Sequence, residues 1–422
     1  MMAGSPTRWR EAHAHLFEHG RAMSFVKLDG CATLDAALST LAEAAATTPA
    51  GEWLIAIGAR PESWPERRWP TQAELCRAIG DVPACVWCFD YHALLTNDAG
   101  LKAARFTDND LHAFDQHGFI EQRDGVFTGV LLEGAAGYLW DRIEPPKGDA
   151  RRRVLRAAID DLASGGCVEL HDLKSQRWLG PELAALDDES PLPMRIVLYP
   201  LVEDLEAVVE SAPSWRRGRI TIGGGKLFSD GTLNSRTAWM LEPYADPPPE
   251  HPEGLKIADE ASIEDAIRRC DALGLPMATH AIGDGAVRAV LDAIERVEPK
   301  AAGFRIEHGE LIDGADVPRL AGLGVTWSPQ PCHLLTDIEV LERTLPHRLE
   351  RVLPLREAID AGLTPGESLI FGSDTPIVRP DPADSIVAAT RRGREGGARI
   401  APAQAITEAE AWACFAPTGE HF

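Results

Sequence analysis

The stretch Glu11-Ala12-His13-Ala14-His15-Leu16-Phe17 places two histidines one residue apart near the start of the chain, in a segment with the pattern of a β-strand. On a strand, residues i and i+2 point to the same face, so the two imidazoles lie side by side. Two imidazoles on one face supply half of a metal site. The alternative is a solvated pair at a sheet edge, and that alternative predicts nothing about the other strands.

Three later strand segments also end in a residue that can bind a metal ion. His280 comes late in "MATHAIG", His308 comes late in "RIEHGEL", and Asp374 ends "LIFGSDTP". Taken singly, each histidine is better explained as a hydrogen-bonded core residue. Together, four histidines and one aspartate at the ends of four strands predict a shared metal site. The carboxyl ends of parallel strands meet at one mouth when the strands close into a barrel.

Short apolar, β-branched runs alternate with longer segments of helical periodicity. This alternation predicts an α/β fold with a parallel sheet, and eight such units closing into a barrel fit the length of 422 residues. There are ten strand candidates, so two of them are insertions or are not strands. The predicted strands are 10–16, 53–59, 85–92, 166–173, 195–200, 226–231, 277–283, 305–311, 325–331 and 369–376. The predicted helices are 33–46, 151–164, 262–273, 284–297 and 313–323.

No break in composition divides the chain. We therefore predict one domain over residues 1–422, with insertions within 60–165 and 241–256. The prolines of residues 241–254 predict an irregular loop over one face of the domain.

Composition excludes several classes of partner. The formal net charge of -23 disfavours nucleic acid and anionic membranes, which carry charge of the same sign. No apolar run approaches the roughly 20 residues that span a bilayer, and the first residues lack the apolar region of a signal peptide. Eight cysteines form no disulfide framework, which favours a reducing cytoplasm. Cys85 and Cys88 have CxxC spacing, but no second pair follows, and we predict two buried apolar residues.

Lys226 begins a strand segment and is predicted to lie inside the barrel, beside the histidines. An ammonium group next to a divalent cation would be repelled. Either Lys226 carries a carboxylate added by carbon dioxide and bridges two metal ions, or it points elsewhere and pairs with an acid such as Asp230. A surface lysine in a Gly-rich turn is a third interpretation.

These segments together resemble the metal-dependent amidohydrolase superfamily, in particular its YtcJ-like branch, amidohydrolase family 3. The resemblance extends from residue 10 to about residue 412, in family order. It is carried by "EAHAHL", "VFTGVLLEGA", "KLFSDGTLNSRTA", "THAIGDGAV", "RIEHGELIDGADVPRLAGLGVTWSPQP" and "FGSDTPI".

The resemblance implies a distorted (β/α)8 (TIM) barrel that binds one or two divalent ions, with zinc as the expected metal. The implied metal ligands are His13, His15, His280, His308 and Asp374, together with Lys226 in carboxylated form where two ions share the site. The family's small β-sandwich is expected to be missing, because His13 stands so near the start and the chain stops at Phe422.

The resemblance also suggests residues that contact substrate. His92 in "FDYHALLTN" matches the family stretch "GHxxxxN" and is predicted to be catalytic or to contact substrate, although Tyr91 replaces the usual glycine. His171 is predicted to line the pocket; a buried structural role is the alternative. Asp230 and Arg236 are predicted to shape the substrate loop, or to form a purely structural ion pair.

The predicted activity is hydrolysis of a carbon–nitrogen bond in an amide, N-acyl, formamide or cyclic amide substrate by a metal-activated water, with Asp374 moving the proton. The alternatives are an esterase or lactonase, a lyase or an isomerase with the same ligands, and a catalytically inactive barrel. The expected partners are a small-molecule substrate and a second copy of the chain in a homodimer.

Overall fold

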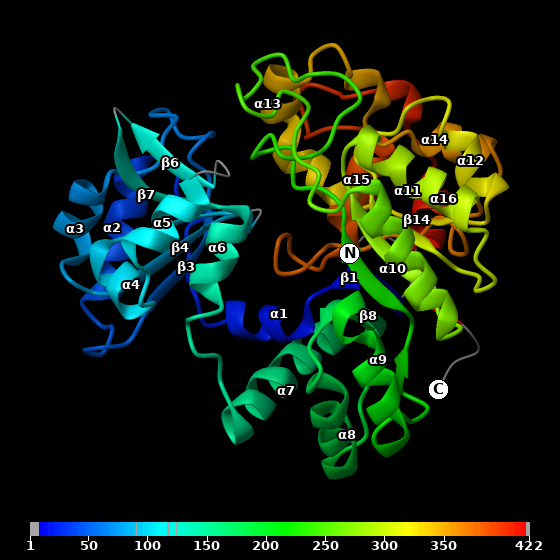
Figure 1. Cartoon of the computed structure of the whole chain (residues 1–422), viewed down its shortest axis with the longest axis horizontal. Coiled ribbons are helices and arrows are strands. Elements are labelled where there is room, and N and C mark those ends of the chain that lie inside the picture. The colour runs from blue at the N-terminus through cyan, green and yellow to red at the C-terminus, as the bar shows by residue number, and fades with distance from the viewer. Residues whose placement is uncertain (1–7, 90, 116–118, 124, 419–422) are drawn as a thin grey trace. The chain divides into compact units, whose positions relative to one another are not determined.

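The computed structural model describes residues 8–89, 91–115, 119–123 and 125–418. The chain divides into two compact units (Figure 1). The first unit consists of Met1–Gly20 and Gly148–Phe422, and the second consists of Arg21–Lys147. The prediction of one domain over 1–422, with insertions within 60–165 and 241–256, stays a prediction.

The first unit contains two four-stranded sheets in which all neighbouring strands are parallel. One sheet has the order β1 (Trp9–Ala14), β8 (Cys167–Ser175), β9 (Arg195–Pro200) and β10 (Ile220–Ile222). The other has the order β11 (Gly225–Phe228), β12 (Met277–Ala281), β13 (Arg305–His308) and β14 (Thr326–Ser328). The α/β fold with parallel strands is therefore confirmed.

Isolated parallel bridges continue the pairing beyond these two sheets. They join Leu201 to Lys226, Trp327 to Leu369, and Ala14 to Thr375. The first bridge links the two sheets, and the other two place residues 369–375 between β14 and β1. The pairing thus runs from β1 through both sheets and returns to β1.

Eight of the ten predicted strand segments lie in this unit, and 53–59 and 85–92 coincide with strands of the other unit. The segment 369–376 makes isolated bridges rather than a regular strand, and Asp374 within it has φ +60, outside the extended region. The segment 85–92 was predicted too long, because β4 ends at Cys88 and Tyr91 also has φ +60.

The second unit has one six-stranded sheet of mixed direction. Its first three strands are parallel, and the others pair antiparallel. The order is β2 (Val26–Lys27), β3 (Leu54–Ala59), β4 (Ala84–Cys88), β5 (Ala93–Thr96), β7 (Val126–Leu132) and β6 (Ile120–Arg123).

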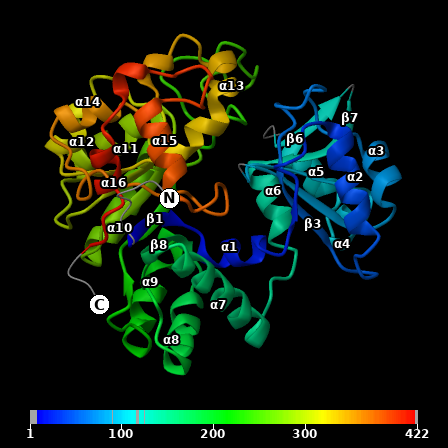
Figure 2. The same cartoon turned by 180° about the vertical axis from the view of Figure 1, so that it is seen from behind.

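The helices of the first unit pack on the outside of its strands, where their apolar faces are buried. Helices α7, α8 and α9 pack against β8, β10 and β9, and α10 to α12 pack against the second sheet (Figure 2). In this unit the helices are α7 (Gly148–Ser164), α8 (Leu179–Glu189), α9 (Val202–Ser211), α10 (Glu260–Ala272), α11 (Asp284–Val297), α12 (Val317–Gly322), α13 (Leu334–Thr344), α14 (Leu355–Asp360), α15 (Pro382–Arg391) and α16 (Glu408–Ala413). Helix α1 (Leu16–Ala22) follows β1, and the second unit contains α2 (Leu34–Ala45), α3 (Gln72–Ile79), α4 (Asp98–Ala103), α5 (Asp108–Asp115) and α6 (Glu133–Trp140).

Local sequence explains several helix boundaries. Helix α2 begins after Thr33, whose side chain accepts a hydrogen bond from the Ala36 amide, and α10 begins after Asp259, which accepts one from the Ser262 amide. Helix α12 begins four residues later than predicted, at Val317 instead of residue 313.

None of the helices in the described ranges is long and apolar enough to cross a membrane.

All eight cysteines lie in the described residues, where none is paired in a disulfide. Cys85 and Cys88 on β4 are buried, as the apolar setting of their CxxC pair predicts.

Candidate metal centre

His13 on β1 and His15, the first residue after this strand, meet Asp374 from the other end of the chain. Nε2 of His15 lies 3.0 Å from Oδ1 of Asp374, and Nε2 of His13 lies 3.4 Å from the same oxygen. His13 and Asp374 are buried, and the His15 side chain is 22% exposed. One potential ligand atom from each of the three residues lies within 4.8 Å of the others. The group therefore offers two imidazoles and one carboxylate to a cation.

His280 and His308 stand at the carboxyl ends of β12 and β13, beside this group. The His308 ring lies 4.9 Å from the His13 ring and 4.4 Å from the His280 ring, measured between centroids. Nε2 of His280 lies 3.1 Å from the Gly231 carbonyl oxygen, which only accepts, so Nε2 carries a proton. The structure thus brings the five predicted side chains together.

Lys226 is fully buried on β11, which excludes the surface-turn interpretation. Its Nζ has no hydrogen-bond partner among the described residues, so the alternative pairing with Asp230 is not made. Asp230 instead accepts hydrogen bonds from the amides of Trp239, Ile282 and Gly283. Burial lowers the pKa of Lys226 to about 8, although the carboxylates of Glu307 and Asp374 act in the opposite direction.

The donor set fits a divalent ion. Imidazole nitrogen and carboxylate oxygen are the ligands that zinc binds in catalytic sites. Among the described residues, Nδ1 of His308 and Nζ of Lys226 are buried without a hydrogen-bond partner. Buried polar atoms in native proteins are nearly always satisfied, so the unpaired imidazole nitrogen fits a bound cation, and the unpaired lysine nitrogen fits a further group such as a carboxylate.

Electrostatics keeps Asp374 ionised. Burial alone would raise the pKa of Asp374, but His13 and His15 outweigh burial and hold this pKa well below its usual range. Burial lowers the pKa of His13 to about 4, although Asp374 acts against that change, so the imidazole is neutral. A neutral imidazole and an ionised carboxylate are the forms that bind metal.

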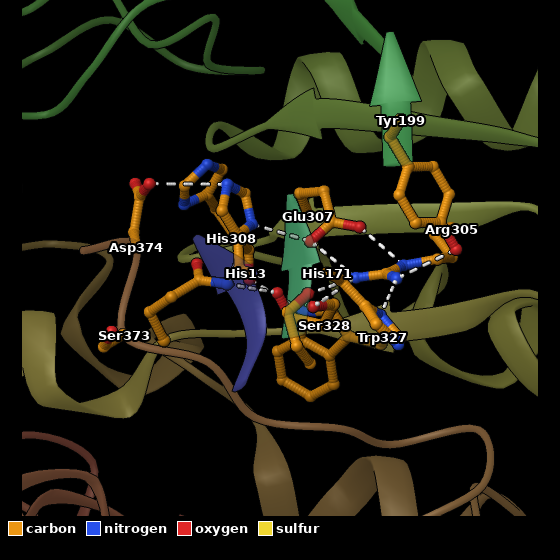
Figure 3. A network of polar contacts seen from close by, with 12 residues as sticks. His13, His171, Tyr199, Arg305, Glu307, His308, Trp327, Ser328, Ser373 and Asp374 are labelled. Atoms are coloured by element: carbon orange, nitrogen blue, oxygen red, sulfur yellow. Dashed lines mark hydrogen bonds and ion pairs between the residues drawn. The ribbon is translucent and has the colours of Figure 1, made fainter. Parts of the chain in front are cut away.

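Glu307 and Arg305 are buried charged residues that sequence reasoning missed. Glu307 accepts a hydrogen bond from Nδ1 of His13 at 2.7 Å, and Nε of Arg305 lies 2.7 Å from the other Glu307 oxygen (Figure 3). Burial would raise the pKa of Glu307, but Arg305 and His13 more than offset burial and hold it well below its usual range. The available signal was two charges at alternate positions of a short strand, which place both side chains on one face.

Glu310 and His333 were also missed, and they form a second group with His308. Nδ1 of His333 lies 3.5 Å from Oε1 of Glu310, and Nε2 lies 3.3 Å from the Ser373 carbonyl oxygen. Both neighbours only accept, so both nitrogens carry a proton. Burial lowers the pKa of His333, but Glu310 and Asp374 outweigh it and raise this pKa to about 9.

His171 on β8 uses both ring nitrogens within the protein. Its Nδ1 accepts from Nη1 of Arg305 at 2.8 Å, and its Nε2 lies 3.0 Å from Oε1 of Glu169. Burial lowers the pKa of His171 to about 4, although Glu169 opposes the change.

Arg236 forms an ion pair with Asp246. The substrate-binding roles of His171, Asp230 and Arg236 stay predictions.

His92 belongs to the second unit, between β4 and β5. Its Nδ1 lies 2.7 Å from Oε2 of Glu133, and its side chain is 19% exposed. Tyr91 lies beside it with φ +60, and its ring packs against Trp87 with 5.5 Å between centroids. The catalytic or substrate-contacting role of His92 stays a prediction.

Comparison with known proteins covers nearly the whole chain. A model described as the amidohydrolase family matches residues 10–419. YtcJ of Bacillus subtilis (strain 168) is 28% identical over 393 residues, 90% of this chain and 72% of that protein. The N-substituted formamide deformylase of Arthrobacter pascens is 25% identical over 403 residues, with coverages of 90% and 72%. The crystal structure of an uncharacterized metal-dependent hydrolase from Pyrococcus horikoshii OT3 matches with a TM-score of 0.74 and 25% identity, over 96% of this chain and 78% of that one.

Proposed function

We propose that this chain, which belongs to the amidohydrolase family, is a metal-dependent hydrolase that cleaves a carbon–nitrogen bond in an amide, N-acyl, formamide or cyclic amide substrate. The observation that carries the proposal is the buried convergence of His13, His15 and Asp374 from opposite ends of the chain. The similarity to a formamide deformylase and to a metal-dependent hydrolase supports the same reaction class.

The fold that we propose for the first unit is a distorted (β/α)8 barrel. The continuous parallel pairing from β1 back to β1 supports closure. Helices packed outside the strands support it as well. In such barrels the active site forms at the carboxyl ends of the strands, which is where His280 and His308 stand.

The proposed cofactor is zinc, as one ion or two. His13, His15 and Asp374 would hold one ion, and His280 and His308 the other, with carboxylated Lys226 between them. A bound zinc ion lowers the pKa of water to about 7 and polarises the scissile carbonyl group. The lowered pKa of Lys226 supports carboxylation, because the neutral amine is the form that reacts with carbon dioxide.

Asp374 is the proposed proton carrier of the reaction. Its ionised carboxylate accepts the proton released as water attacks the substrate carbonyl carbon, and then delivers that proton to the leaving nitrogen. The backbone holds Asp374 for this task, because its amide donates to the His13 carbonyl oxygen at 2.8 Å. A small-molecule substrate, a homodimer and a cytoplasmic setting remain part of the proposal.

Metal analysis of the purified full chain, in chelator-free buffer near neutral pH, tests the proposal. We expect about one to two divalent ions per chain, and His280→Ala should lose most of them. His347→Ala, which removes an exposed histidine of the same unit, should keep them. A wild-type protein that binds no divalent metal would refute the hydrolase proposal.

Substrate screening then separates the reaction classes. The panel contains N-formyl and N-acyl amines, cyclic amides, lactones and esters, each with and without a chelator. Metal-dependent release of amine supports carbon–nitrogen hydrolysis. Turnover of lactones or esters alone would favour the esterase alternative, and bound metal with no turnover across the panel would favour an inactive barrel.

A further inference from the structure

The two ring nitrogens of His13 face different surroundings. Nδ1 lies 2.7 Å from Oε2 of Glu307, and Nε2 lies 3.4 Å from Oδ1 of Asp374 (Figure 3). His13 is 1% exposed and Glu307 is fully buried, so water does not compete for this contact. The ring is therefore held at one nitrogen by a protein carboxylate while its other nitrogen faces the metal-binding group.

Arg305 supplies the charge that keeps Glu307 an acceptor. The two side chains approach in two places, with Nε 2.7 Å from Oε1 and Nη2 3.1 Å from Oε2. Nη2 of Arg305 also donates to the Ala12 carbonyl oxygen at 2.8 Å, which ties the guanidinium to the strand that carries His13. Of these two contacts, the one from Nη2 to Oε2 is a hydrogen bond, and the one from Nε to Oε1 is an ion-pair contact without hydrogen-bond geometry. A guanidinium this close favours the ionised carboxylate, and an ionised carboxylate can only accept. Nδ1 of His13 must then be the donor.

Gln330 also contacts Nδ1 of His13, and it favours the opposite tautomer. Its Nε2 lies 3.3 Å from Nδ1 of His13, and it is oriented by donating to the Ser328 carbonyl oxygen at 2.8 Å. An amide N–H facing Nδ1 favours a lone pair at Nδ1 and a proton at Nε2. Oδ1 of Asp374, 3.4 Å from Nε2, likewise favours a proton on Nε2. The contact between Nδ1 and Glu307 is much shorter, at 2.7 Å, and charge-assisted hydrogen bonds are about twice as strong as neutral ones, so Glu307 decides the tautomer.

We propose that Glu307 is a positioning residue that keeps the proton of His13 on Nδ1 and the lone pair on Nε2, and thereby sets the affinity of this centre for divalent metal. The inference rests on the proposed metal-dependent function. Replacing an outer partner of a metal-binding histidine typically lowers metal affinity about 10- to 100-fold. In a variant without the Glu307 carboxylate, Gln330 would stabilise the tautomer with the proton on Nε2, which cannot bind metal through Nε2. The loss of metal affinity should therefore be larger than a loss of ring orientation alone would cause.

The first test measures zinc affinity of Glu307→Gln by competition with a chromophoric chelator. We expect the dissociation constant to rise about 10- to 100-fold relative to wild type. Glu169→Gln is the matched control, since Glu169 is also a buried carboxylate against a buried histidine, His171, which is not a proposed ligand. The control should stay within about threefold of wild type. Equal affinities for the two variants would overturn the inference.

The second test reads the tautomer directly in zinc-free protein with 15N-labelled histidine, by NMR. The His13 signals are assigned by their loss in His13→Asn. In wild type we expect the proton on Nδ1, and in Glu307→Gln we expect it to move, in whole or in part, to Nε2. A purely structural role for Glu307 would not move it.

The two tests also separate this inference from the function on which it rests. If Glu307→Gln does not fold, the wild-type spectrum alone decides, because a proton found on Nε2 of His13 contradicts the inference. Wild type that binds no zinc would refute the proposed function. Wild type that binds zinc, with the His13 proton on Nδ1 and unmoved in Glu307→Gln, would refute only the role of Glu307.

Discussion

Nε2 of His15 and Oδ1 of Asp374 lie 3.0 Å apart although the two residues come from opposite ends of the chain. Main-chain pairing sets this distance. The His15 amide donates to the Thr375 carbonyl oxygen at 2.9 Å, and the Asp374 amide donates to the His13 carbonyl oxygen at 2.8 Å. The backbone therefore holds the side chains in place before any cation binds, which lowers the entropy that binding must overcome.

Asp374→Asn keeps the size of the side chain and removes its charge and its basicity. We expect kcat/KM on a substrate found in the screen to fall by about 10²- to 10⁴-fold, because a positioned proton carrier contributes roughly that much. Zinc affinity should also fall. Asp384→Asn, a nearby change at a residue paired with Arg379, serves as the control. Full activity in Asp374→Asn would remove this residue from the mechanism.

Lys226→Met should make the metal-free protein more stable. The substitution replaces a buried amine, which has no hydrogen-bond partner in the described part of the chain, with an apolar side chain of similar length. An unsatisfied buried polar group costs about 1–3 kcal/mol, so the free energy of unfolding in chelator should rise by about that amount. Adding zinc should stabilise wild type more than the variant. Urea denaturation with and without zinc measures both effects, and a less stable variant in chelator contradicts the prediction.

The same lysine predicts a pH dependence. The pKa of Lys226 is about 8 in the folded protein, against 10.5 for an ordinary exposed lysine, so between these values the unfolded chain binds more protons. The free energy of unfolding therefore rises with pH across this window, and below pH 8 the penalty of the buried charge is complete. We compare the free energies of unfolding of Lys226→Met and wild type, both in chelator. The difference between them should shrink from pH 8 to 10.5, by about 3 kcal/mol at most. A gap that stays constant over that range would be inconsistent with a buried Lys226 ammonium.

Gly372→Ala should disturb the closure between residues 369–375 and β1. A Cβ at Gly372 would lie 2.5 Å from the His13 amide nitrogen and 2.6 Å from Oε1 of Glu11, and neither backbone nor buried carboxylate can easily yield. We expect the free energy of unfolding to fall by about 1–3 kcal/mol and zinc affinity to fall with it. Gly322→Ala on α12 meets nothing within 4 Å and should stabilise the protein slightly, by up to about 1 kcal/mol. Equal effects of the two changes would argue against a close approach at Gly372.

The sequence indicated where two of the histidines lie relative to strand ends. His280 and His308 come late in segments whose alternation with helices predicts a parallel sheet, and the structure places both at the carboxyl ends of adjacent strands, β12 and β13. The strand 85–92 was predicted too long because its apolar run continues past the point where Tyr91 takes a left-handed conformation. The spacing of apolar residues indicates which face of a segment is apolar, but it does not indicate the backbone angle φ at any residue.

The sequence did not predict which groups the site residues contact. Glu307 stands beside His308 in the sequence, yet it contacts His13, and nothing in the local pattern of "RIEH" names that partner. His333 follows β14 and lies between Glu310 and a carbonyl oxygen of residue 373. Such contacts depend on which strands become neighbours, and that is a property of the closed sheet rather than of any one segment.

By itself, the sequence determined the class of the fold, the family, and which side chains arrive at strand ends, because side-chain alternation and helix periodicity are local consequences of backbone geometry. Only the tertiary structure decided that Lys226 is buried with no hydrogen-bond partner among the residues described, that Glu307 faces His13, and that His333 lies between two acceptors. The physical reason is that protonation, tautomer and burial depend on groups brought close in space from segments far apart in the chain.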